Sequence, residues 1–287
     1  DKHNLIDHVI FSPRANLRYN PTENINLRFS YSSGFRAPQA FDEDLHVENV
    51  GGNVAMVELA DNLKEERSQS LSASADIYHR FGAFQVNFLV EGFYTKLSDV
   101  FALTDGEVVD GILTRTRYNA PGARVMGLTL EGKMAYAWLQ LQAGATIQRS
   151  RYKEAVTWSE TNPDLPAQKK MFRTPDVYGY FTSTFTPVKR LAISFTGTYT
   201  GTMLVQHLAG YIPEDREEKT PDFFDLNMKV AYDFPLYKSV TLQVNAGVQN
   251  IFEAYQSDFD QGKDRDSKYI YGPGMPRSYF VGCKISY

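Results

Sequence analysis

The chain has 287 residues, a formal net charge of −4 and a mean hydropathy of −0.38. No run of about 18 apolar residues occurs, which excludes a transmembrane helix, and the weakly acidic balance argues against nucleic acid as a partner. The single Cys283 excludes an intrachain disulfide framework and a cysteine metal cluster.

Apolar and polar residues alternate with a period of two along most of the chain, which predicts about eleven β-strands. In chain order the predicted strands cover residues 10–19, 25–32, 68–78, 84–95, 112–132, 138–152, 175–186, 191–199, 224–232, 240–249 and 279–287. The fifth is expected to bend near Pro121-Gly122, because proline cannot join an interior ladder.

The connections between these strands alternate in length. Tight turns are predicted at residues 20–23, 80–82 and 187–190 and at Pro235-Leu236. Short turns of about three to five residues alternate with loops of about 12 to 34 residues, an asymmetry typical of outer-membrane barrels. All the long loops would then lie at one end of the sheet.

Aromatic residues gather beside the short turns, which is typical of the interfacial girdle of a membrane barrel. They are Tyr78, Phe81, Phe84, Tyr136, Trp138, Phe185, Tyr232, Phe234, Tyr237 and Tyr287. The opposite strand faces are rich in Gln, Asn, Thr and Ser, which suits a polar lumen. The alternative interpretation is a soluble β-sandwich whose hairpin-end aromatics pack a core.

Two segments carry a family resemblance. YSSGFRAP (residues 31–38), followed by NLKEERS (62–68), resembles the "FRAP" box and the next strand opening of TonB-dependent outer-membrane receptors, with Ala60-Asp61 in place of the usual Asn-Pro. QNIF (249–252) and GPGMPRSYFVG (272–282) resemble the last hairpin of that family. The alternation up to Tyr287 is similar to the terminal signal read by the barrel-assembly machinery.

The resemblance implies an all-β, antiparallel transmembrane β-barrel. Plugged transporters have 22 strands, so about eleven strands correspond to half of such a barrel. Residues 1–287 are therefore expected to be the C-terminal part of a receptor barrel, with the plug and the first half of the barrel absent. Two unpaired sheet edges would then remain. A companion chain such as the missing N-terminal half of the same protein, dimerisation or a non-native closure would be needed to cover them.

The resemblance also implies a function. The chain would be part of a receptor in the outer membrane of a Gram-negative bacterium, for energy-coupled uptake of a metal chelate: a ferric siderophore, haem or cobalamin. Its partners would be that chelate, the lipid bilayer and the TonB system, reached through the missing N-terminal region. No enzyme motif is present, so no catalytic residue is predicted. A passive or structural outer-membrane barrel and a soluble binding module are the alternatives.

Ligand contacts are expected in the long loops. Asp42, Asp44 and His46 follow the FRAP box that contains Arg36, and the resemblance makes His46 a candidate haem ligand. A hydrogen-bonded or solvated histidine is the alternative. Further candidates are His207, Tyr255 and Arg265.

Charged runs suggest two more sites. Asp258, Asp260 and Asp264 could hold calcium, as in cobalamin receptors of the family, or form a solvated charge run. No intrinsic cofactor is expected otherwise. Arg149, Arg151, Lys169 and Lys170 flank one loop and could attract an anionic siderophore, or simply border the loop.

Overall fold

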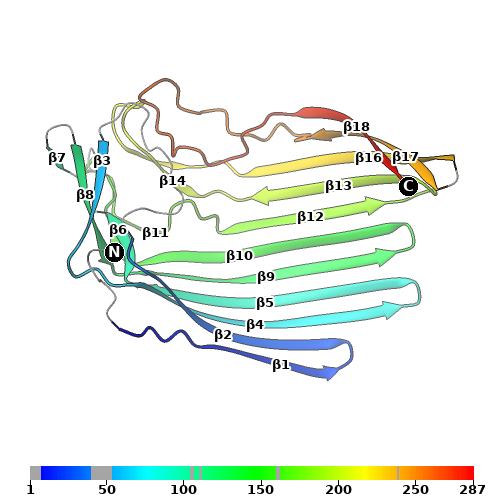
Figure 1. Ribbon diagram of the computed structural model, residues 1–287, viewed down its shortest axis with the longest axis horizontal. Coiled ribbons are helices and arrows are strands. Elements are labelled where there is room, and N and C mark those ends of the chain that lie inside the picture. Colours follow the sequence, from blue (N-terminus) through cyan, green and yellow to red (C-terminus); the bar gives the residue numbers. More distant parts are fainter. Residues whose placement is uncertain (1–7, 40–53, 104–106, 110–111, 160–161, 238) are drawn as a thin grey trace.

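The computed structural model describes residues 8–39, 54–103, 107–109, 112–159, 162–237 and 239–287. A 12-stranded antiparallel sheet dominates it, and Figure 1 shows its long strands side by side. Eleven strands form the main path: β1 (Arg14–Thr22), β2 (Ile25–Arg36), β4 (Glu66–Phe81), β5 (Phe84–Ser98), β9 (Ala123–Tyr136), β10 (Leu139–Val156), β12 (Val177–Phe185), β13 (Leu191–Thr200), β16 (Phe223–Tyr237), β17 (Val240–Gln249) and β18 (Ser278–Ser286). For the main path, the predicted number and order of long strands are confirmed.

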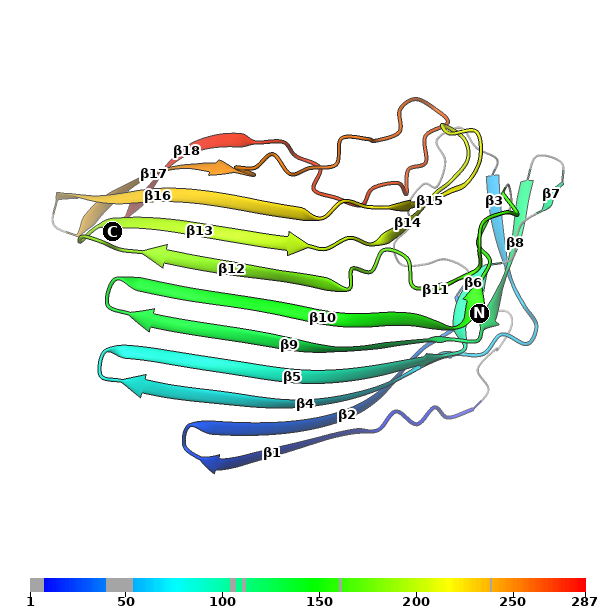
Figure 2. The same cartoon turned by 180° about the vertical axis from the view of Figure 1, so that it is seen from behind.

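Short turns and long connections lie at opposite ends of this sheet, as Figures 1 and 2 show. The loop end carries the short strand β11 (Gln168–Lys170) and two small sheets. One is the hairpin of β14 (Leu204–His207) and β15 (Arg216–Lys219). In the other, β8 (Ile112–Ala120) pairs with β6 (Val100–Leu103), β7 (Glu107–Val109) and, in parallel, β3 (Val54–Leu59).

The sequence prediction of a single bent strand over residues 112–132 is corrected: the bend is a complete break. Gly122 has a φ of 99°, a conformation that suits glycine, and a side chain there would collide with the Leu97 carbonyl oxygen. The chain therefore leaves the main sheet, and β8 belongs to the small sheet at the loop end.

The predicted turn at Pro235-Leu236 is also corrected. Pro235 lies opposite Thr241 inside the β16–β17 ladder, and the connection follows Tyr237. The ladder shifts register between Pro235 and Tyr237. This irregularity accommodates a residue that has no N–H to donate.

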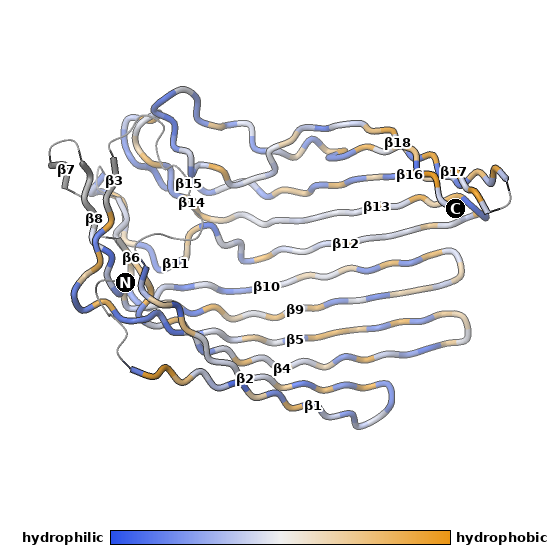
Figure 3. The backbone as a smooth tube through the Cα atoms, in the orientation of Figure 1, coloured by the Kyte–Doolittle hydropathy of each residue, from blue (hydrophilic) through white to orange (hydrophobic). Residues whose placement is uncertain are grey.

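The two faces of the sheet differ in polarity, and Figure 3 shows hydrophobic and hydrophilic residues alternating along the strands. One row across β2, β4, β5, β9 and β10 reads Phe29, Ala73, Gly92, Leu128, Ile147. Phe29, Leu128 and Ile147 are 49%, 42% and 62% exposed. We call this apolar side the outer face and the opposite side the inner face.

On the inner face polar side chains hydrogen-bond across strands. Ser70 Oγ and Thr95 Oγ1 are 2.9 Å apart, and Thr129 Oγ1 and Thr146 Oγ1 are 3.0 Å apart. A sandwich would place its apolar sides between two sheets. Among the described residues one sheet leaves its apolar side uncovered, which does not fit the soluble β-sandwich alternative.

Aromatic side chains form a continuous row at the short-turn end of the outer face. Ring centroids are 6.3 Å apart for Phe84 and Tyr136, 5.8 Å for Tyr136 and Trp138, and 5.2 Å for Trp138 and Phe185. The predicted gathering of aromatics beside the short turns is confirmed there, and its position at a membrane interface stays a prediction. Tyr78 is an exception, because it lies on the inner face, where its hydroxyl donates to Gln85 Oε1 at 3.1 Å.

Glycines lie opposite aromatic residues at several places on the inner face. Gly127 pairs with Phe93, and Gly144 pairs with Tyr180. In both pairs the ring lies across the glycine, so that a Cβ on the glycine would collide with ring carbon atoms. These pairs let large rings lie flat against the sheet.

The main sheet ends in two unpaired edges. β1 and β18 each pair with one neighbour only and do not pair with each other, so the sheet does not close on itself. In the parts of the chain described above, no helix is long and apolar enough to cross a membrane.

Candidate ligand-binding site

The best-packed part of the molecule lies at the loop end. Buried apolar residues are scarce in the described chain, and the one cluster among them joins Met203, Val205 and Tyr269, with Tyr271 packed against it. Val205 is fully buried. The cluster ties the β14–β15 hairpin to residues 250–276, and we call this assembly the loop core.

The buried side chain of Gln256 links backbone groups within the loop core by hydrogen bonds. Its side chain is 1% exposed, and its Nε2 donates to the Tyr269 carbonyl oxygen at 3.0 Å. Its Oε1 accepts from the backbone N–H groups of Tyr271 at 2.8 Å and Gly272 at 3.3 Å. One amide therefore satisfies three backbone groups, which would otherwise be costly to bury.

His207 is part of the same packing. It is 6% exposed, and its Nε2 lies 3.0 Å and 3.1 Å from the two carboxylate oxygens of Asp260. Its ring stacks on Tyr269, with centroids 3.6 Å apart and planes 9° apart. Predicted as a ligand contact, His207 is thus held inside the loop core, and Asp260 also accepts from the Asp266 N–H at 2.9 Å.

Asp258 binds two tyrosines. The hydroxyl of Tyr269 donates to one of its carboxylate oxygens at 3.0 Å, and the hydroxyl of Tyr271 donates to the other at 2.7 Å. Burial, together with this carboxylate, raises the pKa of both tyrosines above the ordinary value. Both hydroxyls therefore stay protonated and act as donors.

The three aspartates of the calcium hypothesis have separate environments. Asp258 accepts from tyrosines, Asp260 is buried beside His207, and Asp264 is exposed. Among the residues that the structure describes, no three His, Cys, Asp or Glu side chains come together to hold a metal ion. Calcium binding stays a prediction, and the geometry adds no support to it.

The remaining predicted ligand residues are spread over the loop end. The Arg36 guanidinium lies over the ring of Phe101, 5.0 Å from its centroid. Arg265 Nη1 donates to the Gly262 carbonyl oxygen at 2.8 Å, and Tyr255 is half-buried. Residues 42, 44 and 46 (Asp42, Asp44 and His46) lie outside the described residues, so their roles stay predictions.

A buried carboxylate lies immediately before β4, the strand that follows the loop after the FRAP box. Glu65 is 5% exposed and accepts from the Arg67 guanidinium, and His8 Nε2 lies 3.4 Å from the same oxygen. Burial alone would raise the pKa of Glu65, but the hydrogen bonds from Arg67 and His8 outweigh it and lower that pKa. Glu65 therefore stays ionised and anchors the base of this loop.

Several buried polar atoms have no hydrogen-bond partner in the described chain. They include Trp158 Nε1, Asp176 Oδ1, Glu217 Oε2 and Asp225 Oδ1. Native proteins leave few such atoms unpaired, so these mark places where water, a ligand or another protein segment can bind. Sequence reasoning missed them; the one available signal was a charged residue such as Asp225 on the polar face of a strand.

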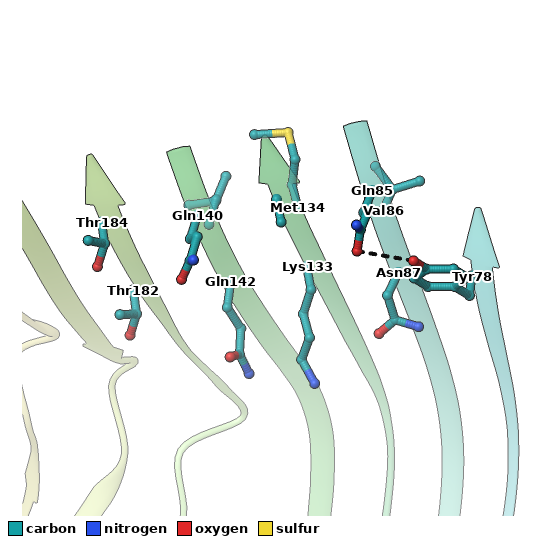
Figure 4. A pocket seen from close by; sticks show the side chains of 12 residues that line it. Tyr78, Gln85, Val86, Asn87, Lys133, Met134, Gln140, Gln142, Thr182 and Thr184 are labelled. Atoms are coloured by element: carbon teal, nitrogen blue, oxygen red, sulfur yellow. Dashed lines mark hydrogen bonds between the residues drawn. The ribbon is translucent and has the colours of Figure 1, made fainter. Parts of the chain in front are cut away.

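The inner face carries two hollows whose linings mix polar and apolar residues. One, of about 360 Å³, lies toward the short turns, and side chains such as Asn87, Lys133 and Gln142 reach into it from neighbouring strands (Figure 4). The other, of about 510 Å³, lies beneath residues 273–276 and contains Asp225 and Lys229. Both hollows face the side on which a barrel would enclose its lumen.

These features define the class of protein. An up-and-down antiparallel sheet with an apolar outer face, a polar inner face, and turns and loops at opposite ends is part of the wall of a membrane-type β-barrel. The family model described as TonB dependent receptor-like, beta-barrel matches residues 4–251. The chain therefore belongs to the TonB-dependent receptor β-barrel family.

Solved structures of similar fold include an iron transporter and siderophore receptors. The FrpB iron transporter from Neisseria meningitidis aligns with a TM-score of 0.65 and 19% identity, over 95% of this chain and 39% of that one. The siderophore receptor PirA from Acinetobacter baumannii aligns with a TM-score of 0.63 and 14% identity, over 95% of this chain and 40% of that one. The ferric-catecholate import receptor Fiu from E. coli aligns with a TM-score of 0.61 and 17% identity, over 94% of this chain and 34% of that one.

At these identities the likeness shows the fold alone. The chain spans well under half the length of the structures that it matches. None of the curated protein sequences matches it significantly.

Proposed function

We propose that this chain is the C-terminal part of an outer-membrane receptor that takes up a metal chelate, with a ferric siderophore as the first candidate. The observation that carries the proposal is the inner face. A hollow that contains Asp225 and Lys229, together with the unpaired buried atom Asp225 Oδ1, lies beneath the packed loop core. A chelate entering from the loop end would meet these groups, and the structural neighbours named for iron and siderophores support this choice.

The remaining parts of the receptor are proposed from the same features. The edges β1 and β18 are expected to pair with the first half of the barrel, because an open edge invites pairing with other chains. The lumen would hold a plug, which the polar inner face suits. Energy would come from the TonB system through the N-terminal region, and assembly would use the barrel-assembly machinery.

Transport of this kind makes and breaks no covalent bond in the chelate. The chain's own groups would bind the chelate and position it, and the energy-coupled step would release it inward. Ferric siderophores are commonly anionic, so donors such as Lys229 and the Arg36 guanidinium are the expected contacts rather than catalytic groups.

Uptake can be tested with the complete receptor. Ferric siderophores, haem and cobalamin would be titrated against the purified protein, and uptake of the bound one would be measured in cells with and without the TonB system. High-affinity binding of one chelate, with uptake that needs TonB, supports the proposal. Diffusive uptake that is independent of TonB would instead identify a passive barrel.

Lys229→Gln provides a test at one residue, since Lys229 lines the hollow beneath residues 273–276. We expect weaker chelate binding with an unchanged fold. Lys189→Gln, in an exposed turn at the opposite end, is the matched control. If both variants bind the chelate with equal affinity, the hollow is not part of the binding site.

A further inference from the structure

Four cationic side chains gather on the outer face at the loop end. Lys96, Arg124 and Arg151 occupy directly opposed positions on β5, β9 and β10. Arg149 lies two residues from Arg151 on β10, opposite the exposed Met126. We call these four residues the outer cationic row. The sequence interpretation that Arg149 and Arg151 attract a ligand to the loop is therefore corrected, because both lie on the outer face.

Three members of this row have no ion-pair partner within the described part of the chain. Among the residues described, none forms an ion pair with Lys96, Arg124 or Arg149. The acidic residues of the paired parts of these strands, such as Glu91 and Glu131, alternate onto the inner face. Positive charge thus accumulates where an anion can approach from outside the sheet.

An apolar groove of about 730 Å³ lies directly beside the row. Its walls include Phe29, Leu71, Tyr94, Met126, Leu128 and Ile147. Its floor is formed by small residues, because Ala73 and Gly92 lie opposite each other on β4 and β5. A Cβ at Gly92 would meet no atom within 4 Å, so the depression is open to the outside.

The cations are confined to one part of the sheet. Toward the loop ends of β12, β13 and β16 the outer face carries Val177, Tyr199 and Phe224 instead. The ring of Phe224 stacks with those of Phe181 and Phe252, at 6.4 Å and 5.9 Å. Cations are therefore not a general feature of the outer face near the loop end. The outer cationic row and its groove form a distinct site.

We propose that this site binds a membrane lipid whose headgroup carries two or more phosphates. The guanidinium and ammonium groups bind the phosphates, arginine in bidentate fashion, and an acyl chain lies in the groove. Neighbouring strands are about 4.8 Å apart, so Lys96 and Arg151 are separated by roughly 10 Å. This separation lets one headgroup place two phosphates on the row. The inference rests on the membrane placement proposed above and does not depend on which chelate is carried.

The headgroup test uses the complete receptor in detergent and counts retained lipid by native mass spectrometry. The probes are diphosphoryl lipid A, its monophosphoryl form and phosphatidylglycerol. We expect the receptor to retain the diphosphoryl lipid most strongly. Changing Lys96, Arg124 and Arg149 together to Gln should weaken that binding at least tenfold. The control changes three exposed cations elsewhere, Arg14, Lys189 and Lys284, to Gln and should leave it unchanged.

The groove is tested separately with two glycines of the outer face. Gly92→Leu fills the floor, whereas Gly132→Leu places the same side chain further toward the turn end of β9; a Cβ at either position meets no atom within 4 Å. We expect Gly92→Leu to weaken lipid binding severalfold and Gly132→Leu to have no effect. Unfolding of each variant in vesicles checks that the barrel still forms.

Three outcomes would overturn the proposal: equal retention of all three lipids, equal losses in the test and control cation variants, or equal effects of the two glycine variants. A receptor that fails to insert into vesicles would contradict the membrane placement itself. A receptor that binds this lipid but transports no chelate would contradict only the proposed uptake function.

Discussion

Replacing Gln256 with alanine should open the loop core while leaving the barrel wall intact. The substitution removes three hydrogen bonds and leaves the Tyr269 carbonyl and the N–H groups of Tyr271 and Gly272 without partners. Each buried group left unpaired costs about 1–3 kcal/mol, so the loop core should lose about 3 kcal/mol. At about 1.4 kcal/mol per tenfold change, its opening becomes roughly 100-fold more frequent.

Amide hydrogen exchange measures this opening directly. In Gln256→Ala, exchange at the Tyr271 N–H should accelerate by that factor, while exchange in β13 should not change. Gln261→Ala, an exposed glutamine of the same connection, should have no effect. Unchanged protection of Tyr271 in Gln256→Ala, or the same acceleration in Gln261→Ala, would refute the role given to this side chain.

Three further predictions concern pH, the turn end and the outer face. Burial raises the pKa of Tyr269, so its contribution to loop-core stability should be complete below about pH 10, the ordinary tyrosine pKa, and should fall as the pH rises further. Protease resistance of the loop core measures this loss, which should be smaller in Tyr269→Phe. Trp138→Ala removes ring contacts to Tyr136 and Phe185 and should cost about 2 kcal/mol in urea unfolding from vesicles. Leu128→Arg on the outer face should cost about 2–4 kcal/mol in the same assay, whereas Thr196→Arg on the inner face should cost far less; equal costs would contradict the assigned faces.

Period-two alternation was sufficient to predict the long strands because each has one apolar and one polar face. The same alternation fixes which residues point outward, yet Arg149 and Arg151 were grouped with a loop ligand. Counting two-residue steps from the apolar Ile147 places both arginines on the outer face. The information was present in the sequence, but proximity to a loop was given more weight than position within the strand.

The loop core could not be predicted in the same way. The contact of His207 with Asp260 joins residues that are 53 apart, in segments with no periodic pattern. The parallel pairing of β3 with β8 likewise depends on how two loops meet above the sheet. Clustered aspartates suggested a metal site, but carboxylates also accept hydrogen bonds from tyrosines and backbone N–H groups, as Asp258 and Asp260 do.

The glycine–aromatic pairs of the inner face bear on how the strands find their alignment. A one-residue slip between two strands exchanges their faces and is strongly disfavoured. A two-residue slip keeps every side chain on its proper face, so the amphipathic pattern alone does not oppose it. Such a slip would move Tyr180 from Gly144 onto Gln142 or Thr146, where a side chain occupies the space of the ring. The glycine–aromatic pairs therefore favour the native strand register over the register shifted by two residues, which has the same amphipathic pattern.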